Sequence, residues 1–499
     1  MWRDFSVTTR ARAVLGVRMV SLLLAGALPL LLACPAAAQN LLLRLVNDPL
    51  LAENPDLALP PGGMGADGEV AQICPAPNPA AKMDLADAVR HALCSSPKTR
   101  AAWISINAQQ AQLGVARSAY LPTLNLVGQY SEDLQSSRVE GMDDSTARTR
   151  VRQGQLNLSW KLYDFGAREA NVAAARFQLQ AAIASRDDAI QTVYLNTAID
   201  YFTAASAQAS LKAARENEQA ASDSHAVALA KFTVGAVSLS DKLQSETAFT
   251  QATYDRQRAE AERKAALGLL ASDVGLSPSA DIQLGDAFNA KPDPLFMQSI
   301  DELIKQASEH HPKLLAARAR ASAALAKRDY IAAQGRPILS VSGRYTLDNQ
   351  PYALFRDFSL PARNDDRFIG ITLTIPLFEG FSRTYQTKGA AADAENAKTV
   401  VDDLERDIAS SVWKSYQLLQ ADVLSLDTAR SLQDTARQSF EATQERYQAG
   451  VGSILELLNA QKALANAQLL QIQANSNWNI SRLRLAAALG RLDQSATSP

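Results

Sequence analysis

The chain of 499 residues is long enough for several globular domains, but its composition favours long helices instead. Glycine and proline, with 23 and 20 residues, are sparse, whereas the helix-forming residues alanine, glutamine, leucine and arginine are abundant. Fifty basic against 52 acidic residues give a net charge of −2, which removes the electrostatic basis for binding nucleic acid. A hydrophobic content of 47% excludes wholesale disorder.

Residues 1–38 have the pattern of a secretory signal peptide. Arginines precede an apolar run from Met19 to Leu32, and small residues follow it. This run is shorter than the about 20 apolar residues that span a membrane. Cleavage after Ala38 would release an exported chain, whereas a lipoprotein signal, the alternative, would leave Cys34 as the acylated residue.

Two further cysteines, Cys74 and Cys94, agree with export. An even pair in an oxidising compartment predicts a disulfide, and two free buried thiols are the alternative. The histidines show no zinc-ligand spacing with them. These histidines are His91, His225, His310 and His311.

The chain carries an internal duplication with a constant offset of 215 residues. Landmarks in the first copy recur in the second, for example Pro97 as Pro312 and Tyr130 as Tyr345. We therefore expect repeat 1 at residues 83–296 and repeat 2 at 297–493, flanked by an N-terminal periplasmic extension at 39–82 and a tail at 494–499.

Each repeat is predicted to fold as a helix, two strands, a long helix and a shorter returning helix. Apolar residues along the long helices recur in steps of mostly four and seven, which is typical of coiled coils. For repeat 1 the expected ranges are 85–120, 123–130, 155–162, 167–231 and 238–275. For repeat 2 the expected strands are 338–345 and 369–377, and the long helix is 382–446.

The predicted strands alternate between apolar and polar residues. In residues 155–162, for example, Leu156 and Leu158 alternate with Asn157 and Ser159. Period two indicates one apolar and one polar face. Such strands suit a half-buried soluble hairpin or a membrane barrel, whose strands are about ten residues long.

The segments between the paired helices predict sharp reversals. Gly235 and Gly450 can adopt the left-handed conformation that ends a helix. Ser238-x-x-Asp241 and Ser453-x-x-Glu456 have the pattern of capping boxes that start the next helix. This structural role alone would account for both acidic residues.

Enzymatic motifs are missing from the sequence. It contains no GxxxxGK[ST], HExxH or GxSxG pattern, and no clustered acid–base pair away from the helical reversals. We therefore predict a protein that is not an enzyme and needs no cofactor or metal.

Several short motifs resemble the TolC-type outer-membrane efflux family. They are Pro122-Thr-Leu, Leu162-Tyr-Asp-Phe-Gly166, Pro376-Leu-Phe-Glu-Gly380 and the two glycine turns, and the resemblance covers residues 83–493. It implies a mostly α-helical membrane protein of the outer membrane that forms a homotrimer. Each chain would give four strands to a twelve-stranded transmembrane β-barrel and its helices to a coiled-coil periplasmic tunnel.

The resemblance also implies a gate at the helical reversals. The matching positions are Asp241, Tyr447, Glu456, Asn459 and Ser240. Tyr447 and Asp241 would form one link, while the family partner of Ser240 is an arginine where this chain has Gly452. Glu456 matches one acidic ring, and Asn459 stands where the family pattern has aspartate. Packing under the turn is the alternative role for Tyr447.

Two classes of function follow. The first is an exit duct for tripartite efflux or type I protein secretion, passive itself and joined through a periplasmic adaptor to an inner-membrane ABC or proton-driven transporter. The adaptor would dock on the turns at Val234, Gly235, Ala236, Ala449, Gly450 and Val451. The second class is an exported, elongated coiled-coil tether with soluble hairpins.

Overall fold

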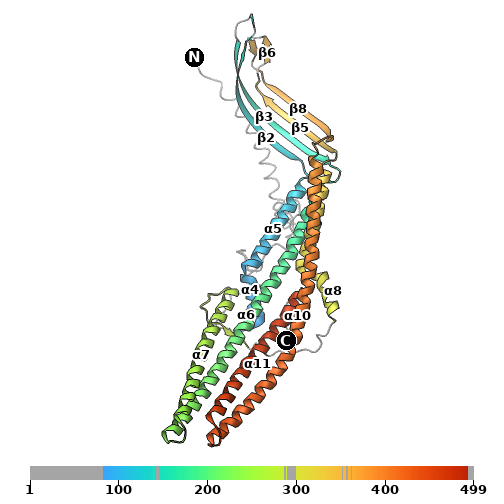
Figure 1. Ribbon diagram of the computed structural model, residues 1–499. Helices are drawn as coiled ribbons and strands as arrows, with labels where there is room; N and C mark the ends of the chain where they lie inside the picture. The colour runs from blue at the N-terminus through green and yellow to red at the C-terminus, as the bar shows by residue number, and fades with distance from the viewer. Residues whose placement is uncertain are drawn as a thin grey trace, which may run out of the picture. The chain divides into compact units, whose positions relative to one another are not determined.

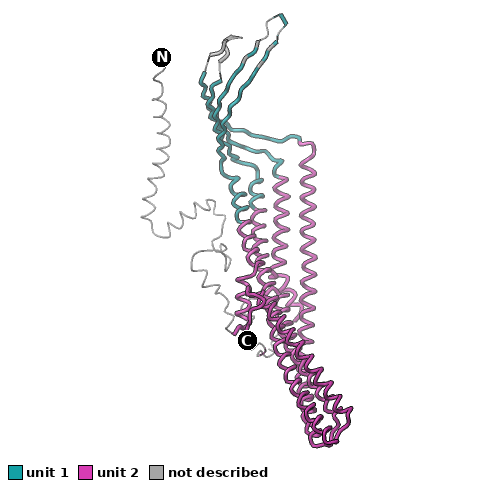
Figure 2. The backbone as a smooth tube through the Cα atoms, turned by 90° about the vertical axis from the view of Figure 1, so that its left-hand side faces the viewer, with its two compact units in different colours: residues 1–58, 110–172, 333–378 teal, residues 59–109, 173–332, 379–499 magenta. Residues whose placement is uncertain are grey.

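The computed structural model describes residues 82–138, 140–141, 145–285, 288, 299–350, 352–355, 358–360 and 362–492. The predicted signal peptide, nearly all of the N-terminal extension, Cys34, Cys74 and the C-terminal tail lie outside these residues. The described chain falls into two compact units (Figure 2). Unit 1 includes residues 110–172 and 333–378, and unit 2 includes 82–109, 173–332 and 379–492.

The helices occur in two sets with the same order and the same lengths (Figure 1). The first set is α4 (Leu85–Ser95), α5 (Pro97–Ser118), α6 (Ala167–Thr233) and α7 (Leu239–Asp273). The second set is α8 (Ile300–His310), α9 (Pro312–Ala333), α10 (Ser382–Gln448) and α11 (Ile454–Ala488). Every helix of the second set begins and ends 215 residues after its counterpart, which is the offset found in the sequence.

The long helices α6 and α10 each contain 67 residues and end two residues beyond the predicted ranges. At 1.5 Å per residue each is about 100 Å long. The predicted seam of α10 is buried where it packs with α8 and α11, notably at Ile408, Val412, Leu419 and Leu426. Within the described residues, no helix is both long and apolar enough to cross a membrane.

The continuous helix predicted over residues 85–120 was wrong, because Ser96 separates α4 from α5. Ser96 has φ −64° and ψ 125°, which is extended backbone. Pro97 follows it, and a residue before proline is disfavoured in helical conformation. His311 before Pro312 makes the same break between α8 and α9.

Unit 1 contains an antiparallel sheet of four strands in the order β2-β3-β5-β8. The strands are β2 (Thr123–Ser137), β3 (Ser145–Tyr163), β5 (Ile338–Asp348) and β8 (Asn364–Thr374). β3 and β5 join the two repeats within the sheet. The strand predicted over 369–377 ends at Thr374, because Pro376 cannot donate a ladder hydrogen bond.

The strands align their apolar residues in register on one face. Leu124, Leu158, Gly343 and Ile369 are consecutive cross-strand partners, and Val341 pairs with Ile371 in the same way. On the opposite face, Asn157 pairs with Arg344 and Lys161 with Ser340. The apolar face is open in the single chain, where Leu126 is 80% and Ile371 71% exposed.

Two small pairings were not predicted from the sequence. In unit 2, β1 (Lys82–Met83) runs parallel to β4 (Gln283–Leu284). They close a core that includes Tyr201, Phe202 and Leu270. In unit 1, β6 (Tyr352–Phe355) pairs with β7 (Phe358–Leu360). Segments of two to four residues are too short to show a period in the sequence.

Candidate functional site

The two helical reversals lie at the same end of unit 2 (Figure 1). We call residues 232–238 the first tip turn and 447–453 the second. In the first, Gly235 has φ +74° and Ala236 donates its N–H to the carbonyl of Lys231, a pattern that ends α6. Ser238 and Asp241 then form the predicted capping box, in which each side chain accepts from the backbone N–H of the other.

The second tip turn repeats the glycine and changes the cap. Gly450 has φ +81°, and Val451 donates its N–H to the carbonyl of Arg446. Ser453 caps α11 by accepting from the N–H of Leu455. The capping box predicted with Glu456 was wrong, because the Glu456 carboxylate instead lies 3.8 Å from the Arg446 guanidinium. Arginine supplies a cation that attracts the carboxylate away from its own helix terminus.

Lys231 joins the ends of α6 and α10. Its ammonium donates to the backbone carbonyl of Tyr447 and lies 4.1 Å from the centroid of the Tyr447 ring. The ring is 3% exposed and packs in a small core with Phe440, Ile454 and Leu457. A cation above an aromatic face and on a carbonyl makes two favourable electrostatic contacts at once. Lys231 therefore connects the hairpin of α6 and α7 to the hairpin of α10 and α11.

The hydroxyl of Tyr447 is buried and has no hydrogen-bond partner within the described residues. The predicted hydrogen bond to Asp241 is thus absent from this structure, where the Asp241 carboxylate accepts from the N–H of Ser238. Burial raises the pKa of Tyr447, and the negative charge of the Asp241 carboxylate raises it further without a direct hydrogen bond. The gate link stays a prediction.

The remaining predicted gate positions lie around the same end. The Ser240 hydroxyl accepts from the amide of Gln244, 3.3 Å away on the same helix. Glu456 and Asn459 are exposed on one face of α11, three residues apart. At Gly452, a Cβ would lie 3.0 Å from the backbone nitrogen of Tyr447 and 3.2 Å from the carbonyl carbon of Arg446. An arginine there would require the backbone to move.

The residues predicted to dock an adaptor are all exposed in the single chain. Val234 is 78% and Val451 71% exposed. Leu239, Leu243 and Leu455 continue this apolar surface onto α7 and α11, where they line a groove of about 740 Å³. Exposed apolar patches of this kind mark interaction surfaces.

The arginine at the start of each long helix was not predicted from the sequence as a site residue. Arg168 forms an ion pair with Asp164, of the Leu162–Gly166 motif, with N–O distance 3.0 Å and both side chains about nine-tenths buried. Its guanidinium also donates to the carbonyls of Lys161 and Leu162. In unit 2, Arg383 contacts both carboxylate oxygens of Glu379 in a more open setting. The offset of 215, which relates both pairs, was the available signal.

Cys94, in α4, is disulfide-bonded. The other two cysteines of the chain, Cys34 and Cys74, lie outside the described residues. The pairing of Cys94 with Cys74 therefore stays a prediction.

Comparisons with known proteins agree with this architecture. Residues 88–275 and 303–491 match the outer membrane efflux protein family. The chain is 30% identical to Protein CyaE of Bordetella pertussis over 448 residues, 88% of this chain and 91% of that protein. It is 25% identical to the alkaline protease secretion protein AprF of Pseudomonas aeruginosa, over 83% of this chain and 85% of that one.

Solved structures share the fold. The outer membrane protein VceC of Vibrio cholerae superposes with a TM-score of 0.70 at 21% identity, over 81% of this chain and 96% of that one. The CmeC outer membrane channel of Campylobacter jejuni gives 0.72 at 19% identity, over 82% and 86%. Both share the fold over more than four-fifths of this chain. The chain belongs to the outer membrane efflux protein family.

Proposed function

We propose that three copies of this chain form the outer-membrane exit duct of a type I protein secretion or efflux system, and that the duct conducts its substrate passively. The observation that carries the proposal is the sheet of unit 1, whose exposed apolar face runs in register across all four strands. A soluble protein rarely leaves such a face in water.

The edges of this sheet support assembly from several copies. β2 and β8 are each paired on one side within the sheet. Lipid offers no hydrogen bonds to the backbone, so a sheet in the membrane must close on itself. Four strands are too few to close, whereas three copies supply twelve, an even number within the range of known barrels.

The alternation assigns the two faces. Leu156, Leu158, Ile371 and Leu373 would face lipid, while Lys161 and Arg344 would face the water-filled lumen. A lysine or arginine on the lipid face near the middle of the bilayer costs about 2–4 kcal/mol. The reverse orientation would place both cations in lipid.

In unit 2, the tip turns would dock a periplasmic adaptor through the exposed surface that includes Val234 and Val451. The adaptor would connect the duct to an inner-membrane transporter that supplies the energy. Protein substrates are the first candidate, because relatives of this chain are named for the secretion of proteases. Small molecules are the second, because others are named as efflux proteins.

The tip turns would also form the gate of the duct. Lys231 and Tyr447 would hold the two hairpins of each chain together, and Asp241 would add the predicted link to Tyr447 when the chains assemble. Three copies of Glu456 would form a negative ring that attracts cations. With Asn459 in place of an aspartate, a second ring would be uncharged.

A matched pair of variants tests the barrel. Leu158→Arg places a cation on the proposed lipid face, and Asn157→Arg places one on the opposite face of the same strand. We expect wild type and Asn157→Arg to require detergent for extraction, to migrate as trimers and to conduct in planar bilayers. Leu158→Arg should fail to insert.

The opposite results would reject the proposal. A chain that leaves the membrane fraction without detergent, or that forms no conducting trimer, would point to the exported tether instead. Equal insertion of both arginine variants would show that neither face of the sheet meets lipid.

A further inference from the structure

Each repeat contains a junction where the returning helix ends against the break between two shorter helices. In repeat 1, a Cβ on Gly275 would lie 2.6 Å from the Ser95 Cβ, so α7 ends in close contact with α4. In repeat 2, a Cβ on Gly490 would lie 2.9 Å from the Cα of His311. These two junctions, both in unit 2, occupy equivalent positions in the two repeats and can be compared residue by residue at the offset of 215.

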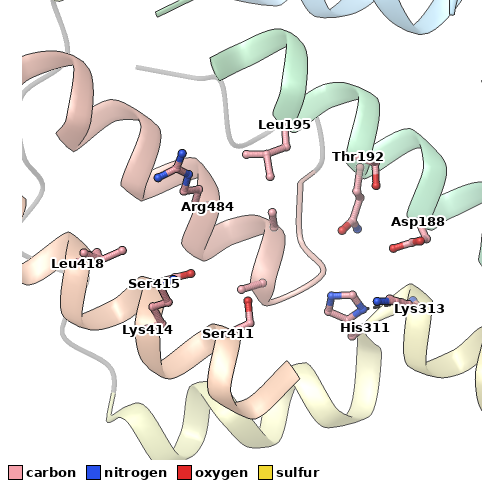
Figure 3. A pocket seen from close by; sticks show the side chains of 13 residues that line it. Asp188, Thr192, Leu195, His311, Lys313, Ser411, Lys414, Ser415, Leu418 and Arg484 are labelled. Carbon is pink, nitrogen blue, oxygen red and sulfur yellow. Dashed lines mark hydrogen bonds between the residues drawn. The ribbon is translucent and has the colours of Figure 1, made fainter. Parts of the chain in front are cut away.

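The repeat 2 junction borders a groove of about 750 Å³ between α6, α9, α10 and α11 (Figure 3). This volume suits a small organic molecule. Ser411, Lys414 and Leu418 line it from α10. They lie on a different face of that helix from Val412 and Leu419, which pack with α8. Among the described residues, none of α8 lines the groove.

Three cationic side chains line the groove, each from a different helix: Lys313 from α9, Lys414 from α10 and Arg484 from α11. In the described part of the chain, none of them has a carboxylate within the 4.0 Å of an ion pair. Asp188 is the carboxylate that lines the groove with them. Positive charge thus exceeds negative charge among the lining residues, and an anion would be attracted.

His311 adds a hydrogen-bond donor. Its Nδ1 accepts from the backbone N–H of Lys313 at 3.2 Å (Figure 3), so the proton of the neutral ring lies on Nε2. Burial lowers the pKa of His311, partly opposed by the charge of Asp188. Burial therefore favours the neutral form of the ring, which keeps one N–H. Gln191, Ser411 and Ser415 supply further polar groups.

Apolar side chains complete the lining. Leu195 on α6, Leu418 on α10 and Ala487 and Ala488 at the end of α11 border the groove. Pockets that bind small organic ligands combine apolar walls with a few polar groups in this way. Inorganic anions would leave the apolar part of the groove unused.

Repeat 1 shows that the fold does not require two of these three charges, whereas Lys313 recurs there as Lys98. The counterparts of Lys414 and Arg484 are Ile199 and Leu269, which are uncharged. The counterparts of Ser415 and Ala488 are Asp200 and Asp273, and burial together with the neighbouring Asp273 raises the pKa of Asp200. Equivalent junctions therefore carry an acidic pair in one repeat and border a cationic groove in the other.

We propose that the groove at the repeat 2 junction binds a small organic anion, whose sulfonate, carboxylate or phosphate group meets Lys414 and Arg484 and whose apolar body contacts Leu195 and Leu418. This site is independent of the exit duct, since it is built within one chain from unit 2.

Equilibrium dialysis of the full-length protein in an amphipathic polymer tests the proposal, with naphthalene-2-sulfonate as the probe. Neutral 2-naphthol, which has the same ring system, serves as the comparison. We expect saturable binding of the sulfonate at about one molecule per chain, weak binding of the naphthol, and an affinity that falls as salt is added.

Variants separate this groove from general surface charge. Lys414→Gln with Arg484→Gln should weaken sulfonate binding by more than about tenfold, because two charge-assisted contacts are lost. Arg437→Gln, also exposed on α10 but outside the groove, is the matched control and should bind like wild type. Ser415→Asp, which copies Asp200 of repeat 1, should abolish binding, and Lys414→Arg should retain it.

Two results would overturn the assignment. One is equal binding of naphthol and sulfonate by wild type. The other is undiminished sulfonate binding by the double variant, provided that its thermal unfolding matches that of wild type. Neither result would bear on membrane insertion or conductance, so the duct and the groove can fail separately.

Discussion

The two repeats have the same helical framework and differ in the polar contacts placed on it. Helix bounds agree residue for residue at the offset of 215, yet three equivalent places have diverged. Arg168–Asp164 is buried and Arg383–Glu379 is partly open. Asp241 caps its own helix, whereas Glu456 turns to Arg446. The junction of repeat 1 carries an acidic pair, whereas the junction of repeat 2 borders a cationic groove.

This difference separates what the framework needs from what each copy adds. Glycines in left-handed conformation occur in both tip turns and after both returning helices, so they belong to the framework. Charged side chains recur at the tips but make different contacts in the two copies, so these contacts belong to the individual copies. Substitutions at equivalent positions should therefore have unequal effects.

The largest difference in unfolding free energy is expected between the variants Arg168→Ala and Arg383→Ala. Removing Arg168 leaves the buried Asp164 carboxylate without its cation, which should cost about 3–5 kcal/mol. Removing Arg383 should cost about 1 kcal/mol, since water can reach Glu379. Denaturant unfolding, followed by circular dichroism, measures both. Equal losses would show that the burial of the first pair is energetically irrelevant.

The next largest difference in stability is expected between Gly452→Val and the variant at the equivalent position of the first tip turn, Val237→Gly. A side chain at 452 meets backbone atoms of Tyr447 and Arg446, which cannot move without opening the turn. We expect a loss of about 1–2 kcal/mol for Gly452→Val. The reverse change at 237 should cost about 1 kcal/mol or less, through backbone entropy alone. Thermal unfolding distinguishes the two, and a stable Gly452→Val protein would contradict the tight turn.

Lys231→Met should loosen the tips more than Arg446→Met, its counterpart at the offset of 215. Methionine keeps the aliphatic stem and loses the contacts of the ammonium with the Tyr447 carbonyl and ring. Amide hydrogen exchange around Tyr447 should become about tenfold faster, which corresponds to about 1.4 kcal/mol. Arg446→Met breaks an exposed contact at 3.8 Å and should change exchange less than about twofold. Equal acceleration would mean that Lys231 does not join the hairpins.

The smallest effect concerns pH. Burial and the hydrogen bond to Asp273 raise the pKa of Asp200 from 3.8 to about 6. The stabilising contribution of the protonated pair is therefore complete below about pH 4 and is lost as the pH rises through 6. Asp200→Asn should match wild type at pH 4 and be more stable at pH 7, by about 1 kcal/mol or less because the carboxyl is partly exposed.

Ser415→Ala at the equivalent position of repeat 2 is the control for this experiment. It removes no titrating group, so its stability relative to wild type should not change between pH 4 and 7. A pH-independent difference for Asp200→Asn would show that the two carboxyl groups do not share a proton.

The framework was largely predictable from the sequence. Glycine turns and the offset of 215 located α6 and α10 to within two residues, and alternation identified the strands and their faces. β3 begins ten residues before its predicted start. This part of the strand was missed because Arg148, Arg150 and Arg152 occupy alternate positions, so the segment shows no alternation of apolar residues. The break at Ser96 was foreseeable from Pro97 alone.

The contacts of the tips were much harder to predict. Lys231 and Tyr447 are 216 residues apart, and their contact depends on how two separate hairpins pack. The second capping box failed because Arg446, seven residues before Ser453, competes for Glu456. Local patterns describe what a side chain can do within its own helix, and tertiary neighbours decide which option it takes.

The equal lengths of α6 and α10 also restrict how such a chain can change during evolution. Inserting one heptad into α6 alone would move Lys231 about 10 Å past Tyr447. The contact between the two hairpins would then be lost. Growth of the helical region therefore requires matched insertions in four helices, two long and two returning, at related points of the gene.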